Sequence, residues 1–211
     1  MRPRWVAVLG MLGLLVGAAR VHGQGVAGQA TAARVNTPVS GAQTFASATM
    51  AANGGMNTAD ADAASVNNVL SAEALKSITT GQTDDSLVSV TSTAEATDVN
   101  VLNGLVSAKV AFALASSYAN LSAATSESNG STLLGLVVNG VAYGDGVPAP
   151  NTRITLQGVG YVVLNEQRAV GDGRRSSELT VTMIHVFLTD PVTGSTTGEI
   201  VVASARSAVS R

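Results

Sequence analysis

Apolar and polar residues alternate strictly along much of the chain from residue 86 onward. Val88 and Val90 alternate with Ser89 and Thr91, and the same rhythm continues to residue 96. A period of two sends successive side chains to opposite faces, so this segment predicts a half-buried strand. A second strand is predicted over residues 106–114, with Lys109 toward solvent and one shared face formed by Val106, Ala108, Val110, Phe112 and Leu114.

Two Asn-Gly pairs interrupt this alternation, at Asn103-Gly104 and at Asn139-Gly140. Each pair lies between two apolar runs. A tight type I′ turn needs positive φ at both central residues, which asparagine and glycine tolerate best. Both pairs therefore predict β-hairpins that join strands adjacent in the sheet.

The longest late strand is predicted over residues 179–189, where nearly every position is apolar. Simple alternation places its side chains on two apolar faces, one with Val181, Met183, His185 and Phe187 and the other with Ile184, Val186 and Leu188. A strand that is apolar on both faces is typical of the middle of a two-layer structure. We therefore expect this strand to be central.

From residue 86 the pattern indicates about seven strands joined mostly by short loops. Residues 63–78 fit helical or strand spacing, and the neighbouring pattern favours strand. The sequence predicts an all-β domain over residues 63–211, an antiparallel β-sandwich with an open barrel as the alternative.

Residues 24–62 are rich in Ala, Gly, Thr and Asn and show little periodicity. Such composition is typical of flexible linkers. We expect a low-complexity linker or arm here, with a weak strand signal only over residues 43–49.

The first 23 residues have the pattern of a secretion signal. Arg2 and Arg4 form a basic start, and residues 5–19 (WVAVLGMLGLLVGAA) carry no charge. Fifteen helical residues span roughly 22 Å, short of the ~30 Å hydrocarbon core of a membrane. Small residues at positions 21 and 23 predict cleavage between Gly23 and Gln24, with the alternative of an uncleaved anchor. We expect a secreted, extracellular or cell-envelope protein with no membrane span in its mature chain.

The composition and net charge of the chain exclude several classes of function. The chain has 12% charged and 3% aromatic residues, and its formal net charge of −2 becomes −5 once the leader and its three arginines are removed, which leaves 9 basic against 14 acidic residues. Nucleic-acid binding needs a basic surface and stacking rings, so it is not expected. The absence of cysteine excludes disulfides, thiolate catalysis and cysteine-ligated zinc.

Five segments together resemble the choice-of-anchor P family of bacterial exported proteins. They are residues 99–108 (VNVLNGLVSA), 132–141 (TLLGLVVNGV), 150–167 (PNTRITLQGVGYVVLNEQ), 179–186 (LTVTMIHV) and 198–205 (GEIVVASA). The resemblance covers roughly residues 64–209. It implies a bacterial, extracytoplasmic setting and one continuous domain, and it transfers no catalytic residues.

Candidate chemistry is sparse. His185 is the only histidine left after cleavage, and a lone histidine on an apolar strand is most often a hydrogen-bonded structural residue. Glu166 and Gln167 end a predicted strand, and Glu178 lies across the following loop. These four residues are weak candidates for one polar site, and we expect no cofactor, no metal site and no catalytic residue.

The sequence thus favours a non-enzymatic structural or interaction module. Its expected partners are a cell-envelope or extracellular component, or a second copy of the chain through exposed sheet edges. The alternative is a secreted hydrolase or carbohydrate-binding domain whose site is built from Glu166, Gln167, Glu178 and His185. The two hypotheses differ in geometry, because only the second requires these four side chains to converge on one pocket.

Overall fold

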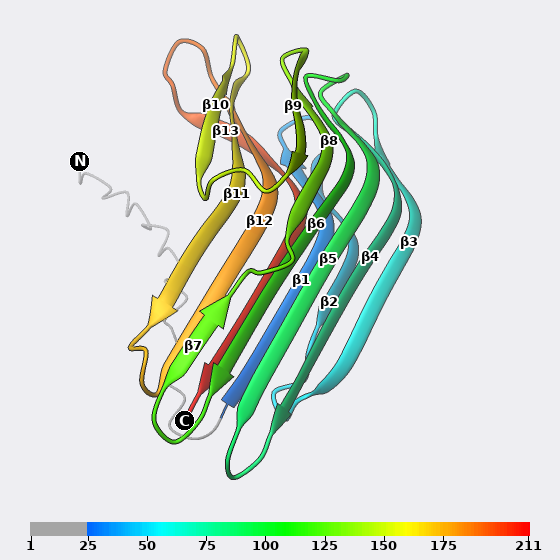
Figure 1. Cartoon of the computed structure of the whole chain (residues 1–211). Coiled ribbons are helices and arrows are strands. Elements are labelled where there is room, and N and C mark those ends of the chain that lie inside the picture. The colour runs from blue at the N-terminus through cyan, green and yellow to red at the C-terminus, as the bar shows by residue number, and fades with distance from the viewer. Residues whose placement is uncertain (1–24) are drawn as a thin grey trace, which may run out of the picture.

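The structure is a computed structural model that describes residues 25–211. These residues form thirteen strands and no helix, arranged as two antiparallel sheets packed face to face (Figure 1). The predicted all-β antiparallel sandwich is confirmed, and the sheets do not close into a barrel. Within residues 25–211 the structure contains no helix of the length and apolarity that a membrane span requires.

Sheet A contains six strands in the order β10-β11-β12-β13-β1-β2. Their bounds are Thr152–Leu156 (β10), Gly160–Gly171 (β11), Ser176–Thr189 (β12), Thr196–Ser210 (β13), Gly25–Thr37 (β1) and Gly41–Thr49 (β2). Sheet B follows the order β3-β4-β5-β6-β8-β9, with β7 paired to β6. Its strands are Gly55–Val66 (β3), Leu70–Thr83 (β4), Val88–Val101 (β5), Val106–Ala119 (β6), Ala124–Glu127 (β7), Thr132–Val138 (β8) and Val141–Gly146 (β9).

The segment 24–62 holds β1, β2 and most of β3, so our expectation of a flexible linker or arm there is wrong. β1 lies inside sheet A between β2 and β13. Its partner β13 comes from the other end of the chain, and a local pattern cannot reveal a pairing over that separation. Its many alanines also weaken the alternation. The predicted signal peptide over residues 1–23 and its cleavage site between Gly23 and Gln24 lie outside the described residues.

Both Asn-Gly pairs form turns, as predicted. β8 ends at Val138 and β9 begins at Val141, with Asn139 at φ 52° and Gly140 at φ 75° between them. The turn after β5 is longer, because Leu102 also adopts a positive φ ahead of Asn103-Gly104. These φ values lie in the left-handed region that the type I′ argument required.

Each sheet carries a crease, which we define as the transverse line at which the alternation of inward and outward side chains reverses. In sheet A it passes through Ala46 in β2, Ala203 in β13 and Asn165 in β11, with φ angles of 47°, 52° and 48°. A residue in the left-handed conformation rotates the peptide group that follows it. The strand therefore buries every second residue on each side of the crease, but the buried set changes from odd to even numbers, or the reverse, at the crease. In sheet B the corresponding residues are Ala74 (φ 44°), Asp98 (φ 44°) and Gly135 (φ 60°).

The crease corrects two predictions about strand faces. In β12 the core receives Val181 and Met183 below the crease and then Ile184 and Val186 above it, while His185 is only partly covered. β12 is an interior strand as predicted, but it has one apolar face rather than two. In β6 the residues expected to share one face divide between two: Val106 and Ala108 are buried, whereas the partly exposed positions are Val110, Phe112 and Leu114.

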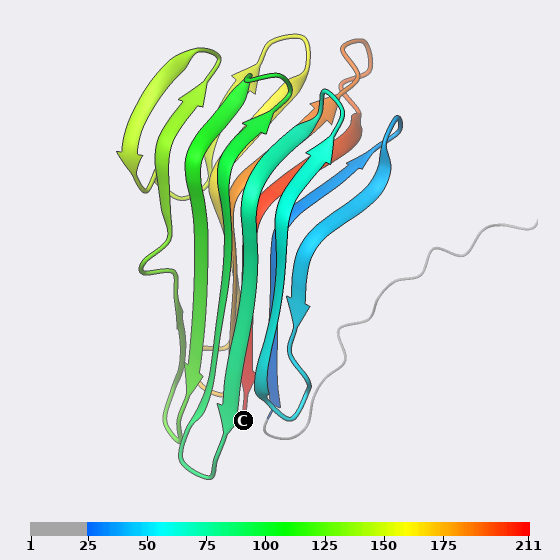
Figure 2. The same cartoon turned by 90° about the vertical axis from the view of Figure 1, so that its right-hand side faces the viewer.

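The two sheets lie close together at one end of the sandwich and diverge above the crease (Figure 2). At the close end Gly28 of β1 leaves no room for a side chain against Thr79 and Ser92 of sheet B. Buried hydroxyls there bond to one another, as between Ser117 Oγ and Ser207 Oγ at 2.7 Å. The largest buried side chains gather at the crease and toward the diverging end: Leu75, Leu133, Leu136, Leu156, Leu164, Met183, Ile184 and Ile200.

Candidate functional site

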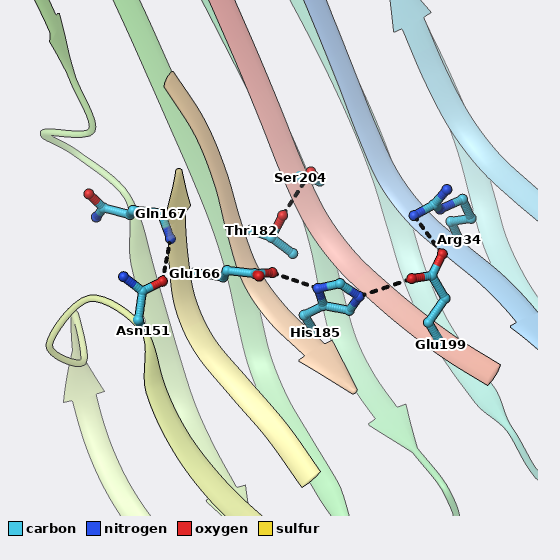
Figure 3. A network of polar contacts seen from close by, with 8 residues as sticks. All are labelled: Arg34, Asn151, Glu166, Gln167, Thr182, His185, Glu199 and Ser204. Atoms are coloured by element: carbon cyan, nitrogen blue, oxygen red, sulfur yellow. Dashed lines mark hydrogen bonds and ion pairs between the residues drawn. The ribbon is translucent and has the colours of Figure 1, made fainter. Parts of the chain in front are cut away.

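Two of the four predicted site residues come together on the outer face of sheet A. Glu166 in β11 and His185 in β12 extend from neighbouring strands toward each other (Figure 3). Leu164 is buried, so regular alternation would also bury Glu166. The crease residue Asn165 reverses the phase and turns Glu166 outward beside the imidazole.

His185 is the centre of a polar network that crosses four strands. Its Nδ1 lies 2.6 Å from Glu166 Oε2, and its Nε2 lies 3.3 Å from Glu199 Oε2 of β13. Glu199 in turn accepts from Arg34 of β1, with 2.9 Å between Nη2 and Oε1 (Figure 3). The network therefore ties β11, β12, β13 and β1 together on one face.

The imidazole is the most covered member of this network. The side chain of His185 is 13% exposed, compared with 37% for Glu166, 28% for Glu199 and 47% for Arg34. The hydrogen bond from His185 holds the pKa of the Glu166 carboxyl below its ordinary value, and the charge of His185 adds to this, while partial burial acts in the opposite direction. Glu166 is consequently ionised over the neutral range.

An aromatic column continues the network toward the edge of sheet A. The rings of His185 and Phe187 have centroids 3.9 Å apart, and Phe187 stacks on Tyr161 at 4.8 Å. The guanidinium of Arg153 lies over the Tyr161 ring at 3.7 Å. These four side chains stack on one another across three strands, so their flat faces serve contacts within the column.

Gln167 and Glu178 do not join this site. The Gln167 amide donates to Ser128 Oγ and Asn165 Oδ1, and its backbone N–H donates to Asn151 Oδ1 at 2.9 Å (Figure 3). Glu178 is opposite Val170 in the β11–β12 register, four residues along β11 from Glu166 and thus roughly 13 Å away.

Glu178 instead forms a bidentate pair with Arg206, in which Nε and Nη2 each lie 2.7 Å from a carboxylate oxygen. The hydrogen bonds that the guanidinium of Arg206 donates to Glu178 raise the pKa of Arg206, and burial acts against this. The four predicted residues are therefore divided among three separate groups of contacts.

The geometry around His185 is unsuited to a hydrolytic triad. A triad histidine has one ring nitrogen toward a nucleophilic hydroxyl and the other toward an acid. Here Glu166 occupies Nδ1 and Glu199 occupies Nε2. A glycosidase pair needs open space between two carboxylates for the scissile bond, and the imidazole fills that space here.

Nearby hydroxyls and hollows do not complete the site either. The hydroxyls of Thr182 and Ser204, on the same face, bond to each other at 2.9 Å (Figure 3). Two hollows of about 130 and 150 Å³ lie elsewhere, at the β3–β4 turn and beside β9, and no residue of the network lines them. Within residues 25–211, no group of three or more His, Asp or Glu side chains is placed to hold a metal ion.

Sequence reasoning missed half of the network. Arg34 lies in the segment that we expected to be a linker, and Glu199 is not among the residues that the sequence singles out. The available signal was the change of phase along β12, where Met183 and Ile184 are consecutive apolar residues. Such a step indicates a crease and would have placed His185 and Phe187 together on the outer face.

Comparison of the chain with protein-family models, with curated proteins and with solved structures finds no match in any of the three. The resemblance to the choice-of-anchor P family therefore stays a prediction that depends on the five segments given above.

Proposed function

We propose that this chain is an exported, non-enzymatic structural or interaction module that acts outside the bacterial cytoplasm, in secreted form or at the cell envelope. One observation carries the non-enzymatic part of the proposal. Both ring nitrogens of His185 are engaged by carboxylates of the same chain, and one of these carboxylates, Glu199, also pairs with Arg34.

The pairing of β1 with β13 bears on how an exported chain would fold. β1 pairs with β13 along its length, from Gly25 opposite Ser210 to Asn36 opposite Glu199. Cleavage before Gln24 would thus leave every described strand intact. Because β1 needs β13 as a partner, sheet A assembles only after the whole chain is made, which suits passage across a membrane in an unfolded state.

The alternative of a secreted hydrolase or carbohydrate-binding domain finds little support. Sugar recognition commonly uses a free aromatic face, and the faces of Tyr161, Phe187 and His185 are turned to one another. The predicted residues Glu178 and Gln167 have partners elsewhere. A polar, acidic surface poor in aromatics also argues against nucleic acid as the partner.

The partner of the module is part of the same proposal. The chain resembles choice-of-anchor P proteins, so its partner would be a cell-envelope or extracellular component, or a second copy of the chain. Network residues such as Glu166 and His185 would then serve to hold the sheet in shape and not to turn over a substrate.

The decisive experiment is a turnover assay on the purified mature chain, residues 24–211, with panels of glycans, esters and peptides. We expect no turnover above that of His185→Ala and Glu166→Gln, compared at equal concentration of folded protein. Turnover by the wild type that either variant abolishes would overturn the proposal. Arg168→Ala, on the exposed part of β11, is the matched control.

A further inference from the structure

Part of β11 forms an open edge of sheet A. β10 pairs with β11 over residues 160–164, and among the described residues no strand lies on the free side of residues 168–171 (Figure 1). Residues 168–171 are all exposed, whichever face of the sheet they are on. The backbone N–H of Gln167 points away from β12 and donates to Asn151, so by alternation the N–H and C=O groups of Ala169 also point away from β12. Backbone groups without a neighbouring strand are a template for pairing with another strand.

Two other edge strands are covered by neighbouring segments. On β2, the carbonyl of Ala46 accepts a hydrogen bond from the Ser77 hydroxyl of sheet B at 2.7 Å. On β10, the carbonyl of Thr155 accepts a hydrogen bond from the side chain of Asn139, in the β8–β9 turn, at 2.9 Å. Each contact holds a segment of sheet B against the edge strand.

The remaining edge strands have features that oppose pairing. β3 exposes Asp60 and Asp62, β9 has positive φ at Gly144 and Gly146, and β7 is four residues long. Like charges, local irregularity and short length each hinder the addition of a strand. The open part of β11 has only Arg168 for this purpose, and a residue of opposite charge follows shortly after it.

The open edge of β11 is complementary to itself. It reads Arg168-Ala169-Val170-Gly171-Asp172, with a cation and an anion each two residues from the valine. In an antiparallel pair with a two-fold axis at Val170, Arg168 of each copy lies opposite Asp172 of the other. Neither charge forms an ion pair with any residue that the structure describes, and Val170 is 52% exposed. The turn hydrogen bonds to Asp172 all go to Oδ1, which leaves Oδ2 for a cation.

This register also fits the free backbone groups. Ala169 of each copy lies opposite Gly171 of the other, so about four main-chain hydrogen bonds can form without the N–H of Gln167, which is already bonded. A pairing centred on Arg168 would set two arginines against each other, and one centred on Ala169 would leave each arginine opposite Val170. Among these three registers, only the pairing centred on Val170 joins opposite charges.

We propose that the open edge of β11, residues 168–172, pairs antiparallel with the same edge of a second copy and joins the two A sheets into one. This inference rests on the proposed function and deepens it, since it names the partner of the interaction module. The contact is short, so we expect a weak dimer with a dissociation constant on the order of 100 µM. Dilute solutions used for turnover assays and melts then contain the monomer.

Cross-linking through an introduced cysteine tests the register, because the chain has no cysteine of its own. Val170→Cys should form a disulfide-linked dimer in oxidised glutathione. The two copies of residue 170 face each other as a non-hydrogen-bonded pair, with Cα atoms about 4.5 Å apart, which is within disulfide reach. Lys109→Cys, an exposed position of sheet B, is the matched control and should stay unlinked. Absence of the dimer at residue 170, or equal cross-linking at both positions, would refute the pairing.

Sedimentation equilibrium of residues 24–211 measures the association without a cross-link. Arg168→Glu should raise the dissociation constant by about tenfold or more, because two like-charged pairs replace two attractive ones. Ala169→Pro should have at least as large an effect, since it removes an edge N–H and leaves the pairing with β12 in place. Lys109→Glu makes the same charge change away from this edge and should leave the dimer unchanged.

A circular-dichroism melt of each variant shows that it is folded. A wild-type chain that stays monomeric up to millimolar concentration, or a dimer unaffected by both Arg168→Glu and Ala169→Pro, would overturn the proposal. Either result leaves the outcome of the turnover assay unchanged, so failure of this inference is distinguishable from failure of the proposed function.

Discussion

Gly28 in β1 and Thr79 in β4 face each other across the sandwich, so closely that a methyl group on residue 28 would overlap the Thr79 hydroxyl. That hydroxyl is already bonded to Ser92 Oγ at 2.9 Å, and both groups are buried. At this contact the sheets are separated only by a glycine and two hydroxyls, with Val90 of the neighbouring apolar cluster beside them. The contact gives a direct test of the spacing between the sheets.

Gly28→Ala should destabilise the domain by about 1–3 kcal/mol, because an added methyl overpacks a site that cannot expand freely. Urea unfolding followed by circular dichroism measures the change. Thr79→Ala in the Gly28→Ala background should recover part of the loss, since it removes the atom with which the new methyl collides. Wild-type stability of Gly28→Ala would contradict the close approach of the two sheets.

Replacement of alanine by glycine should affect stability differently at the crease and at an ordinary strand position. Ala74 has a φ of 44°, a conformation that costs an L-residue roughly 1 kcal/mol and glycine almost nothing. Ala74→Gly should therefore be neutral or stabilise by up to about 1 kcal/mol. Ala63→Gly is the matched control, because Ala63 is an exposed strand residue of β3 outside the positive-φ set, and it should destabilise by about 0.5–1 kcal/mol. Equal losses at the two positions would count against the crease.

Replacement of His185 tests the structural role of the outer-face network. His185→Ala removes the imidazole between Glu166 and Glu199 and its packing on Phe187, and we expect a loss of about 1–2 kcal/mol of unfolding free energy. Arg168→Ala, an exposed residue of the same sheet, should change stability by less than about 0.5 kcal/mol. Thermal melts at one pH compare the two, and equal stability would show that the network contributes nothing to the fold.

The hydrogen bonds of the Asp172 carboxylate predict how the free energy of unfolding falls in acid. Backbone N–H groups of Ser176, Arg174 and Arg175 hydrogen-bond its carboxylate and lower its pKa from 3.8 to about 2. A pKa depressed in the folded state gives stability that is present above the unfolded value, so this contribution should disappear as the pH falls from about 4 to about 2. The lowered pKa of Glu166 acts with the same sign.

An NMR titration of the Asp172 carboxyl is the measurement for this prediction, and it should give a value well below that of the unfolded chain. Asp172→Ala should lose the part of the acid dependence that the β11–β12 turn contributes. A carboxyl that titrates near 3.8 would mean that the turn does not hold the carboxylate in solution.

The strands after residue 86 could be predicted because alternation and Asn-Gly turns are local signals. β5, the β8–β9 hairpin and β12 all follow from such patterns. β1 could not be predicted, since its small residues alternate weakly and its partner β13 lies at the far end of the chain. The creases could not be predicted from simple alternation either. At Ala203 a single alanine with a positive φ changes which residues of the strand face the core, and no glycine in the sequence indicates this change.

The candidate site was predictable only in part for related reasons. The sequence points to Glu166 and His185 by their places on two successive strands, and these two side chains do meet. Nearness in sequence alone links Gln167 and Glu178 to them. The register of β11 and β12 separates Glu178 along the strand, and Gln167 bonds away from the imidazole.

Delivery of this sandwich out of the cytoplasm, with loss of the leader, is the central claim. The intact mass of the full-length chain after expression in a secreting bacterium, recovered from the extracytoplasmic fraction, tests it directly. We expect a mass that corresponds to residues 24–211. Recovery of the chain from the cytosol, or outside it with Met1 still attached, would contradict the account.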